Sequence, residues 1–152
     1  MESWESGSMV IKQLSVFIEN REGRLEQVTE TLAKNDINIV SLSLADTAEY
    51  GVLRLIVSDP IKGKQVLKDA DFSAMLTDVI AIKLPHKIGM LQQVLNDIVT
   101  ADLSVEYMYT LATGENASII VKTSDTIRAE KTLVDNGYEL FAAEDAYSIN
   151  CE

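Results

Sequence analysis

The sequence predicts an α+β protein built from two tandem units, each with the element order β-α-β-β-α-β and an antiparallel sheet packed against helices. Three observations support this prediction: an internal repeat, strand-like alternation of apolar residues, and helix-like apolar stripes between the predicted strands. The expected boundaries are residues 9–76 for the first unit and 77–152 for the second, with no linker between them. Residues 1–8 are polar and show no periodicity, so we expect a disordered leader there, either native or left by cloning.

The repeat has an offset of 66 residues and aligns residues 10–74 with residues 76–140 without a gap. Twelve of the 65 aligned positions are identical. Many other positions keep their apolar character, so the two hydrophobic patterns are in phase and indicate two copies of one unit. The identical pairs are Gly23/Gly89, Leu25/Leu91, Gln27/Gln93, Val28/Val94, Asp36/Asp102, Thr47/Thr113, Glu49/Glu115, Ser58/Ser124, Asp59/Asp125, Ile61/Ile127, Leu67/Leu133 and Asp69/Asp135.

In the first unit, alternating apolar and polar residues predict a strand over residues 13–19. After a loop at residues 20–23, an i, i+3, i+7 stripe predicts a helix that ends at residues 35–36, and its members are Leu25, Val28 and Leu32. The second copy repeats the stripe more clearly, in Leu91, Val94, Leu95, Ile98 and Val99.

Alternation returns over residues 37–44 and 52–57 and predicts a hairpin around residues 46–50. Asp59 followed by Pro60 predicts the start of a second helix, because aspartate caps free backbone N–H groups and proline suits the first helical position. A short strand over residues 73–76 completes the unit, and residues 78–84 open the second copy with a new strand.

The composition argues against several functional classes. With 24 acidic against 13 basic residues, the net charge of −11 would repel a phosphate backbone, so we expect no nucleic-acid partner. No apolar run approaches the roughly 18 residues that a membrane helix needs. The single cysteine, Cys151, can form no intrachain disulfide. We therefore expect a cytoplasmic protein that does not contact the membrane.

The sequence offers no catalytic or metal-binding set. One histidine and one cysteine lie far apart, without a nucleophile motif or a phosphate-binding loop. The carboxylates are scattered as on a solvated surface, so we expect no metal, no cofactor and no enzymatic activity. Tyr107 and Tyr109 share one face of a predicted strand; they suit base stacking on RNA, but the acidic charge favours a role in the core or in pairing.

The segment IENREGRLEQVTETLAKNDINIVSLSLAD, residues 18–46, resembles the opening of an ACT domain, in which a strand leads through a loop ending in Gly-x-Leu into a helix and then a strand beginning Ile-Asn-Ile. The segment LPHKIGMLQQVLNDIVTADLSVEYMYTLA, residues 84–112, resembles it more loosely. The resemblance covers about nine tenths of the chain. It implies two ferredoxin-like domains in a regulatory protein that binds a free amino acid, or a similar small metabolite, where two such domains pair.

The resemblance also implies the binding residues. In family members that bind serine, the ligand is held by an asparagine three residues before the loop glycine and by another at the start of the second strand, which are Asn20 and Asn38 here. An asparagine offers both a donor and an acceptor, and a helix N-terminus offers free N–H groups to a carboxylate. The expected ligand-binding residues are Asn20, Arg21, Glu22, Gly23, Arg24, Leu25, Ile37, Asn38 and Ile39 in the first copy, and His86, Lys87, Ile88, Gly89, Met90, Leu91, Leu103, Ser104 and Val105 in the second.

The sequence departs from the family pattern in both copies. Glu22 and Ile88 stand where the family often has proline, and in the second copy His86 and Ser104 replace the two asparagines. The second site therefore binds something else, binds weakly, or provides only the opposite wall of the first. The asparagines could also be plain turn and strand-start residues, and His86 a solvated loop residue.

Two functions from different classes remain open. One is a sensor that binds an amino acid and regulates amino-acid metabolism, as a homo-oligomer such as a dimer and with a regulated enzyme as partner. The other is a dimerising scaffold that binds no metabolite and acts on a partner protein by contact alone. Binding of a free amino acid to the purified chain separates them.

Overall fold

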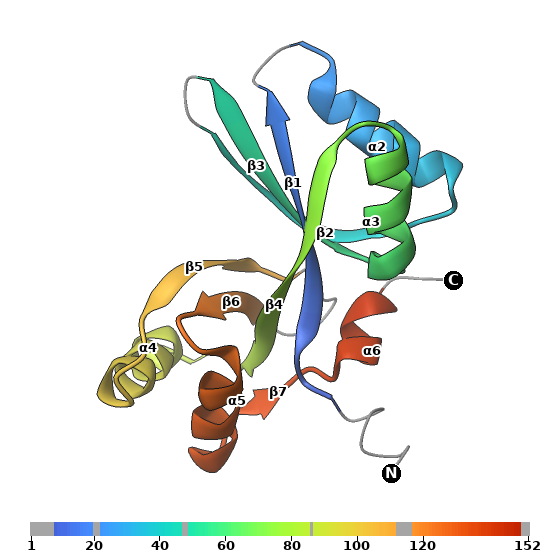
Figure 1. Cartoon of the computed structure of the whole chain (residues 1–152). Helices are drawn as coiled ribbons and strands as arrows, with labels where there is room; N and C mark the ends of the chain where they lie inside the picture. The colour runs from blue at the N-terminus through green and yellow to red at the C-terminus, as the bar shows by residue number, and fades with distance from the viewer. Residues whose placement is uncertain (1–7, 20–21, 47–48, 86, 112–116, 150–152) are drawn as a thin grey trace. The chain divides into compact units, whose positions relative to one another are not determined.

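The chain was analysed as a computed structural model, which divides into two compact units (Figure 1). The first comprises Lys12–Thr77, and the second comprises Asp78–Ile149 together with residues 8–11. The structure describes residues 8–19, 22–46, 49–85, 87–111 and 117–149.

The first unit has the predicted order of elements. Strand β1 (Ile11–Glu19) leads to helix α2 (Arg24–Lys34), the hairpin of β2 (Ile39–Asp46) and β3 (Tyr50–Val57), helix α3 (Pro60–Asp69) and the first part of β4 (Ser73–Leu84). The strand order is β2-β3-β1-β4, and β3 pairs antiparallel with both β1 and β2. This is the ferredoxin-like arrangement that the sequence predicts.

The second unit repeats this order. After the second part of β4 come α4 (Met90–Thr100), β5 (Val105–Thr110), β6 (Ala117–Thr123), α5 (Thr126–Asp135) and β7 (Glu139–Leu140). Strand β6 pairs antiparallel with β4 and β5, and β7 pairs with the other edge of β4. A last helix, α6 (Ala143–Tyr147), was not predicted, because it lies beyond the end of the repeat and has no counterpart in the first copy.

One prediction about strand ends needs correction. The sequence predicted one strand over residues 73–76 and a separate one over 78–84, but β4 is a single strand of 12 residues. Neither glycine nor proline interrupts it, so nothing in the local sequence ends the extended conformation at the unit boundary.

Each unit has its own apolar core between sheet and helices. In the first, Leu14, Val16, Val28 and Leu32 are wholly buried, as the alternation and the stripe predicted. The second core contains Ile80, Ile82, Val94, Ile98 and Val121 among others.

The predicted stripes are wrong at their ends. Leu25, Leu91 and Val99 are 40%, 44% and 68% exposed. The buried residues of each first helix are instead an i, i+4 pair, Val28 with Leu32 and Val94 with Ile98, so the core covers only the middle turns.

The repeat is preserved in the backbone geometry. Asp36 and Asp102 both adopt positive φ, 59° and 62°, after α2 and α4. The bulge between Ile39 and Ser41 in β2 recurs between Val105 and Tyr107 in β5. Positions 66 residues apart therefore share local structure as well as hydrophobicity.

The start of the described chain belongs to the second unit. The carbonyl of Ser8 accepts a hydrogen bond of 2.8 Å from the N–H of Ala143, and Met9 packs against the second core. Ile11 is wholly buried. The predicted leader lies outside the described residues except for Ser8.

Candidate functional site

The loop before α2 is shaped by a glycine. Gly23 has φ 85° and is the N-cap residue of α2, and Gly89 has φ 88° at the same place before α4. A Cβ built on either glycine would meet no atom within 4 Å. The glycines are therefore required by the left-handed backbone and not by close packing. The preceding Asn20 and Arg21, like His86 in the second copy, lie outside the described residues.

The first and second helices of each unit begin differently. The side chain of Asp59 caps α3 by accepting a hydrogen bond of 3.1 Å from Lys62 N–H, and Asp125 caps α5 through Arg128 N–H, also at 3.1 Å. The cap residues of α2 and α4 are Gly23 and Gly89, which have no side chain to accept a hydrogen bond. Because the first N–H groups of a helix need acceptors, α2 can offer its own to an anionic group, whereas in α4 the Met90 N–H already donates to the Lys87 carbonyl at 3.3 Å.

The predicted second-strand residues are each held by a pair of hydrogen bonds, one to a serine hydroxyl and one from the N–H of the same serine. Asn38 N–H donates to Ser58 Oγ at 2.9 Å, and Ser58 N–H donates to the Asn38 carbonyl at 2.9 Å. Ser104 and Ser124 repeat both contacts in the second unit, at 3.2 and 3.0 Å. Asn38 and Ser104 are both exposed, whereas Ile37 and Leu103 are 5% exposed and belong to the cores.

The two halves of the predicted site lie at opposite ends of one sheet. Glu19, which precedes the loop, pairs with Tyr50 at the start of β3, whereas Ile39, which follows Asn38, pairs with Val57 at its end. Seven residues of strand at about 3.3 Å each separate these ends by roughly 23 Å. One small ligand cannot contact the loop and Asn38 of the same unit.

Arg24, the first residue of α2, is held in an unusual setting. Its Nη1 donates to Gln27 Oε1 at 2.7 Å, and its guanidinium lies 4.2 Å from the centre of the Phe72 ring. Its Nε is buried and has no hydrogen-bond partner in the described part of the chain. An unsatisfied buried donor destabilises a protein by about 1–3 kcal/mol, and a cation at a helix N-terminus by about 0.3–1 kcal/mol.

The contact with Phe72 was missed by the sequence analysis. A signal existed, because the repeat aligns Phe72 with Tyr138, so both copies carry an aromatic residue just before the last strand. In the second unit the residue aligned with Arg24 is Met90, and Tyr138 instead donates a hydrogen bond of 2.7 Å to Asp97. Burial, and then the hydrogen bond and negative charge of Asp97, raise the pKa of Tyr138 to about 12.

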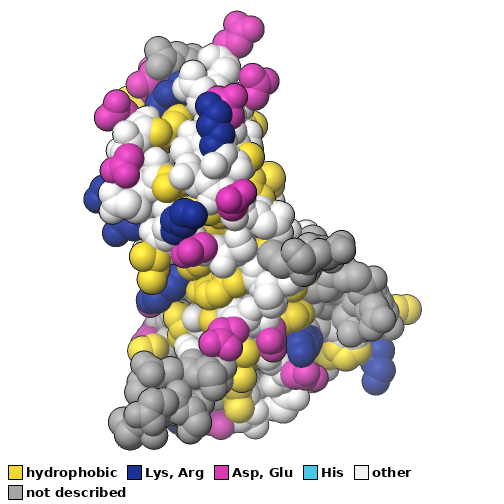
Figure 2. Space-filling model, turned by 90° about the vertical axis from the view of Figure 1, so that its right-hand side faces the viewer, with side chains coloured by type: hydrophobic (Ala, Val, Ile, Leu, Met, Phe, Trp, Pro, Cys, Tyr) yellow, Lys and Arg dark blue, Asp and Glu magenta, His cyan; other side chains and the backbone are white. Residues whose placement is uncertain are grey.

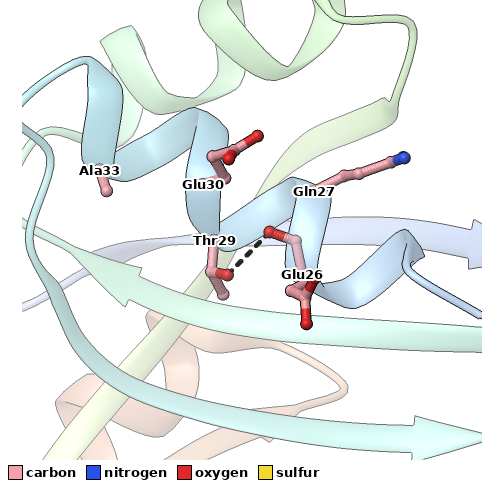
Figure 3. A pocket seen from close by; sticks show the side chains of 5 residues that line it. All are labelled: Glu26, Gln27, Thr29, Glu30 and Ala33. Atoms are coloured by element: carbon pink, nitrogen blue, oxygen red, sulfur yellow. Dashed lines mark hydrogen bonds between the residues drawn. The ribbon is translucent and has the colours of Figure 1, made fainter.

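A surface hollow lies elsewhere on α2. It has a volume of about 360 Å³ and is lined by Glu26, Gln27, Thr29, Glu30 and Ala33 (Figure 3). Thr29 Oγ1 donates to the carbonyl of Glu26 at 3.0 Å. None of these residues belongs to the predicted site, and two carboxylates would repel the carboxylate of an amino acid.

Other kinds of site find little support in the described part of the chain. No group of three or more side chains there could hold a metal ion, and no helix there is long and apolar enough to cross a membrane. Tyr107 and Tyr109 do share a face of β5, since they pair with Lys122 and Ile120. On the face shown in Figure 2, acidic and basic side chains are intermingled, without a broad basic surface for nucleic acid.

Comparisons with known proteins place these features in a family. The family model of the ACT domain pair matches residues 9–149. A protein of Bacteroides thetaiotaomicron, known from its crystal structure, is 41% identical, with 95% of this chain and 100% of that chain covered and a TM-score of 0.89. No curated protein matches the chain.

More distant structures share the fold. The regulatory subunit of aspartate kinase from Thermus thermophilus, in its ligand-free form, is 14% identical over 84% of this chain and 94% of that chain, with a TM-score of 0.59. The corresponding subunit from Thermus flavus is 14% identical over 84% and 93%, with a TM-score of 0.57. The repeat, the two ferredoxin-like units and the match over residues 9–149 show that the chain belongs to the ACT domain pair family.

Proposed function

We propose that this protein is a cytoplasmic sensor that binds a free amino acid, or a similar small metabolite, and regulates an enzyme of amino-acid metabolism. The observation that carries the proposal is the loop ending in Gly23, whose left-handed backbone opens α2 without a capping side chain among the described residues. Helix α3 of the same unit is capped by Asp59, so within this unit the start without a side-chain cap among the described residues follows the loop that resembles the family's ligand loop.

The chemistry of this loop suits a zwitterion. The first N–H groups of α2 and the positive end of its dipole favour a carboxylate. Asn20, by its resemblance to the family's binding asparagine, would supply a donor and an acceptor to the rest of the ligand.

The proposed ligand also needs a second ACT domain. Because Asn38 lies about 23 Å of strand away from the loop of its own unit, a ligand that contacts both kinds of residue must take one of them from another domain. The family resemblance implies a ligand between paired domains. The distance between the loop and Asn38 within a single unit supports the same arrangement.

A regulated enzyme is the proposed partner. Two structures with the same fold are named as regulatory subunits of aspartate kinase. At 14% identity they support the fold and not the particular enzyme. We propose that this chain likewise acts on an enzyme, as a homo-oligomer such as a dimer, and has no catalytic centre of its own.

A thermal-shift screen of the twenty amino acids tests the proposal. A ligand at about 100 times its dissociation constant stabilises the folded state by roughly 2.7 kcal/mol, and each kcal/mol raises the melting midpoint by about 2–4 °C for a chain of this size. We expect one amino acid, or a few related ones, to produce this shift. Failure of all twenty at millimolar concentration would contradict the sensor function.

The scaffold remains the second candidate, and one observation favours it. In the second copy, Ile88 is fully exposed beside the loop glycine and Leu91 is 44% exposed, so this loop presents apolar surface. A scaffold is expected to show no change of melting midpoint with any amino acid and to lose binding of its partner protein on Ile88→Asp. Glu22→Asp, at the equivalent position of the first copy, is the control and should keep that binding.

A further inference from the structure

The setting of Arg24 bears on the charge of the ligand. We infer that the ligand of the first unit carries a net negative charge, as an amino acid with an acidic side chain does, and that Arg24 is the residue that selects it. This inference rests on the proposed amino-acid site at the loop before α2, and it deepens that proposal by naming the class of amino acid.

The charge balance at the start of α2 is the first argument. A zwitterion is neutral overall, so the free N–H groups of the helix already suffice for its single carboxylate. The guanidinium of Arg24 adds a full positive charge at the same end of the helix. Glu22 and Glu26 flank it in sequence, but its contacts among the described residues are with Gln27 and Phe72, which are both uncharged. A second carboxylate on the ligand would balance this charge.

The geometry of the side chain is the second argument. The hydrogen bond to Gln27 and the stacking on the buried Phe72 ring hold the guanidinium in one place before any ligand arrives. A guanidinium held in this way is preorganised for the planar carboxylate group, which accepts two parallel hydrogen bonds. The Nε is buried and has no partner among the described residues, so a ligand carboxylate would bind to the Nη atoms of the guanidinium.

The internal repeat supplies a comparison within the same chain. Gln27 and Gln93 are identical, but Arg24 is replaced by Met90, and Tyr138 stands in place of Phe72. The second unit therefore has the same helix start without the positive side chain. The arginine is not a requirement of the fold, since the second unit forms the same elements with methionine there.

Isothermal titration of the full chain tests the inference with two matched pairs of probes, L-aspartate against L-asparagine and L-glutamate against L-glutamine. We expect at least one acid to bind tenfold or more tightly than its amide. Arg24→Met, which installs the residue of the second copy, should remove this preference by weakening the acid about tenfold or more while changing the amide less than about threefold. Lys34→Met makes the same charge change at the other end of α2 and should leave the preference unchanged.

The outcomes separate the two levels of the proposal. If a neutral or basic amino acid binds best, or if Arg24→Met keeps the preference for the acid, the assignment of the ligand class is wrong while the sensor function stands. If no amino acid binds the parent chain, the proposed function fails and the ligand class fails with it. Should Arg24→Met prove unfolded by far-ultraviolet circular dichroism, Arg24→Gln provides the same loss of charge with a side chain that can still bond to Gln27.

Discussion

Replacing Gly23 by alanine tests the structural basis of the proposed binding loop. Gly23 has φ 85°, and the added Cβ would meet no atom within 4 Å, so the only expected effect is the strain of a left-handed backbone. That strain destabilises an L-residue by about 1–2 kcal/mol. At about 2–4 °C per kcal/mol, the melting midpoint should fall by roughly 2–8 °C. Gly89→Ala, at φ 88° and also without neighbours, should lose the same amount.

Urea denaturation measures this loss as a lower midpoint with an unchanged slope. Gly23→Asn serves as a graded control, because asparagine adopts the left-handed region more readily than alanine and should lose less. Glu22→Ala, an exposed neighbour outside that region, should change the free energy of unfolding by less than about 0.5 kcal/mol. The reasoning is refuted if Gly23→Ala is as stable as the parent, or if asparagine is as harmful there as alanine.

Three further predictions concern the caps, the second strand and Tyr138. Asp59→Ala and Asp125→Ala should each lower the free energy of unfolding by about 0.5–2 kcal/mol, and a serine at either position should restore most of it; equal stability of the alanine and serine variants would contradict the capping role. Asn38→Ala should weaken amino-acid binding by about tenfold or more with little change in the melting midpoint, and parent-like binding would exclude Asn38 from the site. Because the pKa of Tyr138 is raised from 10.0 to about 12, the unfolded chain releases this proton first, so its contribution to stability is complete below pH 10 and is lost as pH rises to about 12. Urea denaturation across this pH range should show that Tyr138→Phe loses less free energy of unfolding than the parent as pH rises. Equal losses in the two proteins would rule out the raised pKa.

Much of the fold could be predicted because its signals are local. The alternation around Leu14, the Asp59-Pro60 pair and the glycine before each helix act within a few residues, so the sequence alone places strands, caps and loops. The internal repeat supports these assignments a second time, because the two copies show the same hydrophobic pattern 66 residues apart. The prediction failed where it placed a boundary that no local signal marks. Residues 73–76 and 78–84 were predicted as two strands, but β4 continues through Thr77.

The ends of the helical stripes show a limit of periodicity. Leu25 and Leu91 fall on the apolar face of their helices, but a stripe records only the direction of a side chain. Whether that side chain meets a partner depends on how far the sheet extends beneath it. The structure leaves both 40% or more exposed, at the end of the helix where the loop begins.

By itself, the sequence determined the two-unit organisation, the order of the elements and the glycine that ends the loop before the first helix of each unit, because these depend on neighbouring residues. Only the tertiary structure decided which of those residues can act together. The strand order β2-β3-β1-β4 makes β1 and β2 run in the same direction on either side of β3. The end of β1 and the start of β2 are therefore at opposite ends of the sheet, which separates the loop before Gly23 from Asn38. The same packing brings Arg24 onto Phe72, 48 residues away in sequence, and no local pattern records such a contact.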